Sequence, residues 1–165
     1  YGEGSILCSH YSPDIDACDE AQSLAAYGQL YNWYAGDDAR GLCPIGWHVP
    51  SDGEWMGLEG HLGMSESVLN SSGWRGTDEG TKLKSTYGWD NGGIGTDNFG
   101  FSALPGGNKI FYFQKAGEFG YWWSSSSTNV ANGRYRLLND GESGIGRQSI
   151  NAQFGFSVRC LKGAD

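Results

Sequence analysis

Positively charged residues are scarce in this sequence. There are 11 Lys and Arg against 19 Asp and Glu in 165 residues, which gives a formal net charge of -8. A nucleic-acid partner requires a cluster of basic side chains to neutralise its phosphates, and no such cluster interrupts the acidic background. The sequence therefore excludes nucleic-acid binding, and it makes attachment to an anionic membrane surface unfavourable.

Long apolar runs are absent as well. The mean hydropathy is -0.47, and no stretch approaches the roughly 20 apolar residues that a membrane-spanning helix needs. The sequence excludes a membrane span of that kind. It starts at Tyr1 without a signal peptide, which we interpret as a mature or trimmed form.

Charged residues make up only 18% of the chain, whereas there are 28 glycines and 14% aromatic residues. Large rings among glycine-rich turns predict a loop-rich domain with a small sheet, not a helix bundle. We interpret residues 1–165 as a single domain, with an irregular N-terminal segment (1–26) and a core (27–160) that carries the motifs.

Motifs of common enzymes are missing. The three histidines, His10, His48 and His61, lack the HExxH spacing of a metalloprotease. The serine run 124–127 lacks the Gly-x-Ser-x-Gly elbow of a hydrolase nucleophile. We therefore expect a protein without catalytic activity, in which His48 is a hydrogen-bonded structural residue.

The strongest local signal is the segment GLCPIGWHVPSDGEW (Gly41–Trp55). Ser51 and Glu54 have the spacing of a capping box, in which each side chain binds the other residue's backbone amide. Apolar residues then recur at helical spacing at Trp55, Leu58 and Leu62, and Gly63 follows. The sequence predicts a helix from about Asp52 to Leu62 with that side in the core.

A second helix is predicted within Ala21–Ala35, because Tyr27, Leu30, Tyr31 and Tyr34 also recur at helical spacing. Met64–Thr81 is predicted to be a loop. The Asn139-Asp140-Gly141 sequence indicates a hairpin turn. Five short strands are predicted in the C-terminal half, at Lys109–Phe113, Tyr121–Ser125, Gly133–Leu138, Arg147–Gln153 and Phe154–Leu161.

Between these regions, Lys82–Gly107 has glycine at nearly every third position. We interpret it as a structural loop whose backbone is held by packed rings and turns. Calcium is the alternative, bound through backbone carbonyls and through the side chains of Asp90, Asn91, Asp97 and Asn98.

Six segments in this order resemble the Fibrobacter succinogenes major paralogous domain family (FISUMP): YGQLYNWYAG, LCPIGWHVPSDGEW, GTKLKSTYGW, GTDNFGFSALPGG, GYWWSSS and GFSVRC. Members are typically secreted or surface proteins of bacteria, so the resemblance implies an extracellular or cell-surface location. The strand with which members usually begin is not evident before Cys8. Either it has been trimmed away or a neighbouring subunit supplies it.

HVPSDGEW and GFSVR also resemble, more distantly, motifs of the formylglycine-generating family. This resemblance implies a C-type-lectin-like α+β fold with two helices, a small antiparallel sheet and long glycine-rich loops. That family's enzymatic activity requires redox-active cysteines late in the domain, and only Cys160 is late here. The prolyl motifs with which C-type lectins hold calcium and sugar together do not occur. The resemblance therefore extends to the fold and not to either activity.

Four cysteines permit three disulfide pairings, and none belongs to a CxxC or zinc-type spacing. Composition alone is compatible with a cytosolic protein whose thiols are free, but extracellular disulfides fit a loop-rich domain better. We predict the pairs Cys8–Cys18, which bracket a short polar loop, and Cys43–Cys160, which lie in the two strongest motifs. We further expect four tryptophans to be mainly core or semi-buried structural residues and not a sugar-stacking platform: Trp47, Trp55, Trp122 and Trp123.

The function expected from the sequence is that of an extracellular recognition or adhesion module, which binds a protein or glycan at a cell surface. Mixed Asn, Ser and Arg side chains over rigid rings form adaptable recognition surfaces, although an ordinary polar sheet face has the same composition. A structural subunit that self-assembles into a surface filament or coat is the alternative. The expected binding residues are Ser126, Ser127, Asn129, Asn132, Arg134, Arg136, Asn139, Arg147 and Asn151.

Overall fold

The computed structural model of the protein describes residues 16–38 and 40–163. Its largest element is a six-stranded sheet with the strand order β2-β7-β6-β5-β3-β4. All neighbouring strands pair antiparallel except β3 and β5. The strands are β2 (Gly73–Arg75), β3 (Gly106–Lys109), β4 (Phe113–Ala116), β5 (Phe119–Asn129), β6 (Asn132–Asn139) and β7 (Ile145–Asn151).

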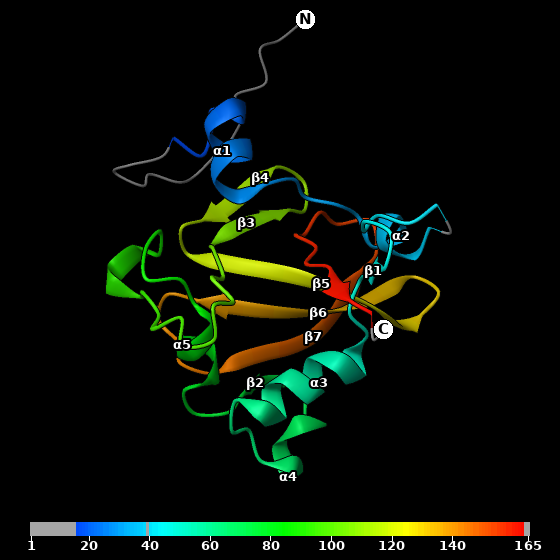
Figure 1. The fold of residues 1–165 in the computed structure, drawn as a ribbon. Helices are drawn as coiled ribbons and strands as arrows, with labels where there is room; N and C mark the ends of the chain where they lie inside the picture. The colour runs from blue at the N-terminus through cyan, green and yellow to red at the C-terminus, as the bar shows by residue number, and fades with distance from the viewer. Residues whose placement is uncertain (1–15, 39, 164–165) are drawn as a thin grey trace, which may run out of the picture.

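A second sheet consists of two short strands, β1 (Trp47–His48) and β8 (Leu161–Lys162), which join distant parts of the chain. The helices are short, and α1 and α3 lie at opposite ends of the molecule (Figure 1). In the described residues the helices are α1 (Glu20–Tyr27), α2 (Trp33–Asp37), α3 (Asp52–His61), α4 (Glu66–Leu69), α5 (Glu79–Leu83) and the 3₁₀-helix η1 (Asp90–Gly92). The α+β class is confirmed.

Both faces of the large sheet are covered, and successive residues of β5 enter different cores. Trp122 packs with Trp55 of α3 and with Trp89, whereas Trp123 packs with Tyr135 and Phe156. This follows from the period-2 alternation of side chains along a strand. Side chains on either face of the sheet centre are consequently buried, including polar ones.

The predicted helix after Ser51 is confirmed as α3. The Ser51 hydroxyl accepts from the amide of Glu54, and the Glu54 carboxylate accepts from the amide of Ser51, so the capping box is complete. Trp55 and Leu62 are buried. Gly63 follows with a φ of 115°, a conformation that glycine adopts without strain.

The second predicted helix is wrong in extent. Two helices, α1 and α2, occupy this region, and they are separated at Gly28, which has a φ of 75°. The aromatic stripe therefore does not lie on one helix: Tyr31 forms an isolated bridge with Phe156, and Tyr34 is exposed. The region predicted as a loop after Met64 contains α4, β2 and part of α5.

The predicted strands are confirmed in the centre of the sheet and wrong at its sides. Lys109–Phe113 is mainly the turn between β3 and β4. Most of Phe154–Leu161 is extended but belongs to no named strand, because its hydrogen bonds go to several segments through isolated bridges. The hairpin predicted at Asn139-Asp140-Gly141 connects β6 and β7 as expected.

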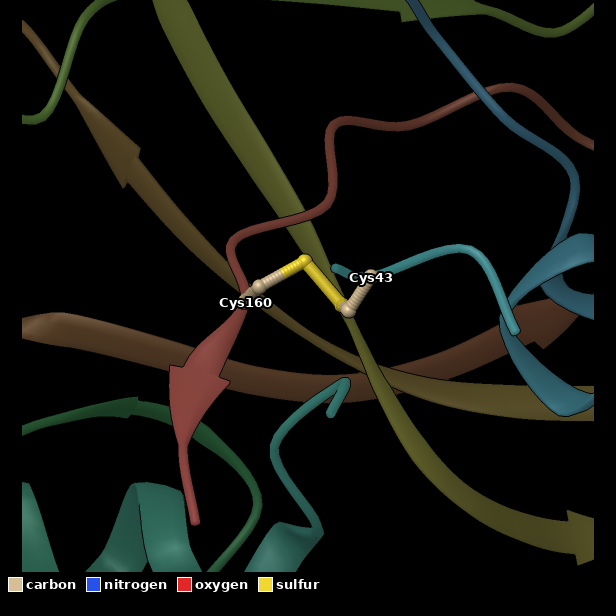
Figure 2. Close-up of a disulfide and its surroundings, with 2 residues drawn as sticks. All are labelled: Cys43 and Cys160. Atoms are coloured by element: carbon tan, nitrogen blue, oxygen red, sulfur yellow. A yellow bond between two sulfur atoms is a disulfide. The ribbon is translucent and has the colours of Figure 1, made fainter. Parts of the chain in front are cut away.

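Cys43 and Cys160 form the predicted disulfide, with Cα atoms 5.7 Å apart across a sequence separation of 117 residues. It connects the loop after α2 to the segment just before β8 (Figure 2). A loop of that length stabilises the fold by about 4–5 kcal/mol on the chain-entropy model. Cys8, the predicted partner of Cys18, lies outside the described residues. The bridge fits a protein outside the cytoplasm.

Candidate ligand-binding surface

An ionic network under α3 attaches this helix to the sheet. Asp52 and Glu59 are two helical turns apart, so both point toward the sheet, and Arg136 of β6 lies between them. The Arg136 Nη1 atom is 2.8 Å from Asp52 Oδ1, and its Nε atom is 2.5 Å from Glu59 Oε1. Glu59 and the Arg136 side chain are 0% and 1% exposed. This network is the main polar contact between α3 and β6.

Two further arginines complete the interior part of the network. Arg147 of β7 binds Asp52 with Nε and Nη2, at 3.0 Å and 2.6 Å. Arg75 of β2 binds Glu59 at 2.7 Å. Both also donate to backbone carbonyls at the end of α4, which carry partial negative charge. The guanidinium groups therefore connect α3, α4 and three strands.

The network contains more positive than negative charge. Desolvation by burial raises the pKa of Asp52, but the hydrogen bonds from Arg147 and Arg136 outweigh it and lower that pKa to about 2. Burial lowers the pKa of Arg75, and repulsion from Arg136 and Arg147 contributes to the same shift. With Arg134, which lies 3.6 Å from Asp52, four guanidinium groups share two carboxylates.

The prediction that Arg136 and Arg147 lie on an open binding surface is wrong. We expected them on a solvated sheet face, because Arg136 alternates with the core residues Tyr135 and Leu137 and Arg147 belongs to the same set of polar residues. The face they point to is covered by α3, and both residues are buried. Sequence reasoning missed this because a strand covered on both faces can still alternate polar and apolar residues. Asn139 is also separate: it lies at the other end of β6, where its carbonyl accepts from Lys84.

The remaining predicted binding residues gather at one end of the sheet, where β5, β6 and β7 extend beyond α3. The strand register pairs Asn132 with both Asn129 and Asn151, and Arg134 with Ser149. Ser149, from the same stretch of mixed polar residues, belongs to this group and is exposed. We call this group the polar end; it consists of Ser126, Ser127, Asn129, Asn132, Arg134, Ser149 and Asn151.

The polar end is more ordered than a loop surface. Ser126 accepts a hydrogen bond from the amide of Asp52 at 2.9 Å, which fixes β5 to the start of α3. The Asn129 side chain accepts from the amide of Ala131 in the connecting turn. Asn129, Ser149 and Asn151 are exposed, and Asn132 and Arg134 are half-buried. The arrangement can present hydrogen-bond donors and acceptors from fixed backbone positions.

Comparison with known proteins identifies the family. The model of the Fibrobacter succinogenes major domain matches residues 5–162. The chain belongs to this family. Neither the curated proteins nor the solved structures contain a match to the chain.

In this Fibrobacter succinogenes major domain, two of the predicted calcium ligands, Asn91 and Asp97, form hydrogen bonds with other side chains of the protein. Asn91 donates to Asp140, and both carboxylate oxygens of Asp97 accept from Ser102. Among the described residues, no group of three or more His, Cys, Asp or Glu side chains is placed to hold a metal ion. Nor is any helix in this part of the chain long and apolar enough to cross a membrane.

The domain also has an apolar hollow of about 240 Å³ between α3 and the C-terminal segment. Exposed apolar side chains lie on the neighbouring β1–β8 sheet. Leu161, which lines the hollow, is 41% exposed, and Trp47 is 45% exposed. Trp47 is therefore more exposed than the core or semi-buried position predicted for it. The hollow is lined by Pro50, Glu54, Trp55, Leu58, Phe101, Arg159, Cys160 and Leu161.

His48 lies close by and is hydrogen-bonded, as predicted. Its Nε2 atom is 2.8 Å from Glu54 Oε1, while the Ser51 hydroxyl donates to the other oxygen of Glu54. The carboxylate therefore stands between the serine and the histidine. In the described part of the domain, no serine hydroxyl donates a hydrogen bond directly to a histidine ring.

Proposed function

We propose that the protein is a non-catalytic, extracellular recognition module that binds a protein or glycan of a cell surface through the polar end. The observation that carries the proposal is the convergence of exposed Asn and Ser side chains from β5, β6 and β7 on one rigid part of the sheet. Short polar side chains on a rigid support form hydrogen bonds with varied partners.

Three features keep this surface fixed. The ionic network attaches α3 to β6 and β7 directly beside it. Trp33 of α2 donates from its indole nitrogen to the carbonyl of Ser124 on the strand that leads to it. The disulfide connects the loop after α2 to the segment just before β8. A preorganised surface of this kind loses less conformational entropy on binding than a mobile loop does.

The proposal includes a C-type-lectin-like fold. In support, the β1–β8 sheet holds an early and a late segment of the chain together, and long irregular connections precede the antiparallel β5–β7 strands. One fold hosts many functions, so the binding surface and not the fold carries the functional argument.

Binding can be tested with a glycan array and with pull-down of bacterial envelope proteins. The double variant Asn132→Ala/Asn151→Ala removes two neighbouring polar groups of the polar end. We expect it to lose most of the captured partner while its thermal unfolding stays close to that of the parent. Asn98→Ala, an exposed asparagine elsewhere, is the matched control. If the double variant and the control capture equal amounts, the polar end is not the binding surface.

Self-assembly into a filament or coat is the second candidate function, and a separate observation favours it. Ile45, Trp47 and Leu161 are exposed around the β1–β8 sheet, beside the apolar hollow. Apolar surface that is open to solvent is a common sign of a protein interface. Light scattering at increasing concentration should then show assembly of the parent but not of Ile45→Ser. A parent that stays monomeric would contradict this alternative.

A further inference from the structure

Arg134 occupies an unusual place at the open edge of the ionic network. Its Nε atom lies 3.6 Å from Asp52 Oδ2, too far for a hydrogen bond, and its side chain is 27% exposed. No hydrogen bond joins its guanidinium group to another described residue. By contrast, Arg136 and Arg147 each bind Asp52 at 2.8 Å or less. The donors of Arg134 are thus available to a ligand.

The electrostatic surroundings favour a negatively charged ligand at this place. Asp52 already neutralises Arg147 and shares Arg136 with Glu59, so the network retains two positive charges in excess. The strands of the polar end contribute no carboxylate, since β5, β6 and β7 contain neither Asp nor Glu. In a protein with a net charge of -8, this local excess is an attractive site for an anion.

Neutral hydrogen-bonding groups surround Arg134 on the same face of the sheet. Asn132 lies two residues away on β6, and Ser149 and Asn151 are the cross-strand partners of Arg134 and Asn132. Paired residues of antiparallel strands have their side chains on one face, within about 5.5 Å at Cβ. A planar guanidinium group can bind a carboxylate with two parallel hydrogen bonds, and amide and hydroxyl groups match sugar hydroxyls.

Resting on the proposed function, we infer that the polar end selects a carbohydrate that bears a carboxylate, such as a uronic acid, with Arg134 as the carboxylate-binding residue. A carbohydrate suits this surface better than an acidic protein does. Stable protein interfaces have buried aromatic or large apolar side chains at their centre. On the face of the sheet that carries Arg134, the residues of the polar end are Asn, Ser and Arg. Ile150, between Ser149 and Asn151, points to the opposite face, and Val130 is exposed in the turn.

The experiment is isothermal titration calorimetry with oligogalacturonate, with its methyl ester and with a polyglutamate peptide. We expect the parent to bind oligogalacturonate, and the methyl ester to bind about tenfold more weakly because the charge is lost. Arg134→Gln should reduce affinity for the acid to the level of the ester. Arg134→Lys, which keeps the charge but not the planar fork, should give an intermediate affinity. Arg40→Gln, whose side chain is 90% exposed in the parent, removes the same charge elsewhere and should change nothing.

Equal affinities of parent and Arg134→Gln for oligogalacturonate, or of the acid and the ester for the parent, would overturn the inference. So would binding of polyglutamate alone. The envelope pull-down separates this failure from failure of the proposed function. If capture still depends on Asn132 and Asn151 but not on Arg134, the surface is correct and the ligand class is wrong. If capture depends on none of them, both are wrong.

Discussion

Glu59→Gln should destabilise the protein more than Arg136→Met, although both residues belong to the same buried network. Glu59 binds Arg75 and Arg136, and its side chain is 0% exposed. The glutamine variant keeps the shape of the side chain but leaves one carboxylate for four guanidinium groups. Breaking a buried pair so that a charge stays uncompensated costs about 3–5 kcal/mol.

Arg136→Met acts in the opposite direction on the charge balance. Asp52 keeps its contact with Arg147, and Glu59 keeps its contact with Arg75. The variant therefore loses hydrogen bonds to charged groups without leaving a carboxylate unpaired, and the apolar side chain can still pack against Trp55. We expect a cost of about 1.5–3 kcal/mol, the contribution of such hydrogen bonds.

Urea unfolding at neutral pH, followed by tryptophan fluorescence, measures both variants under non-reducing conditions in which the disulfide stays intact. Arg40→Met is the control for loss of an exposed arginine and should change the free energy of unfolding by less than about 0.5 kcal/mol. The slope of the unfolding free energy against urea must stay constant for the comparison to hold. If Arg136→Met is the more damaging change, the network does not carry an excess of positive charge, and the electrostatic argument for Arg134 fails with it.

Two further predictions concern acid and the tryptophans. The pKa of Asp52 in the folded state is about 2, below its ordinary 3.8. The contribution of Asp52 to stability is therefore complete above about pH 4 and is lost as the pH falls to about 2. Measured against pH, the free energy of unfolding should fall by about 2 kcal/mol in the parent, and this loss should be absent in Asp52→Asn. Trp123 is 1% exposed and Trp47 is 45% exposed. In urea unfolding, Trp123→Ala should therefore lower the free energy of unfolding by about 3–5 kcal/mol, and Trp47→Ala by about 1 kcal/mol or less. Equal costs would contradict the assigned burial.

Local signals were the part of the fold that could be predicted from the sequence. The capping box at Ser51 and Glu54 defines the start of α3 through contacts within one turn, so no tertiary information is needed. The hairpin between β6 and β7 is also a short-range feature. By contrast, the period-2 pattern of Phe154–Leu161 predicts one strand, but the segment bridges to residues as distant as Tyr31, Lys109 and Trp122.

The candidate site was predictable only in part for a related reason. The register of β5, β6 and β7 brings six of the nine predicted polar residues together at one end of the sheet, whereas Asn139 lies at the other end of β6 and Arg136 and Arg147 are buried. Which of them are exposed depends on how much of the sheet is covered by α3, whose first residue, Asp52, contacts Ser126 beside the polar end. Strand alternation contains no information about that coverage. Arg134 and Arg136 differ by two positions and lie on the same face, yet the side chain of one is 27% exposed and that of the other 1%.

The disulfide also determines how the domain responds to mechanical force. Tension that enters the chain before Cys43 and leaves it after Cys160 passes through the covalent S–S bond and not through the chain between the two cysteines. β2 to β7 and α3 lie within that span and are shielded from the load, together with the polar end. Stretching can unravel only what lies outside the bridge, beginning with α1 and α2, so a bound partner would stay attached while these helices extend.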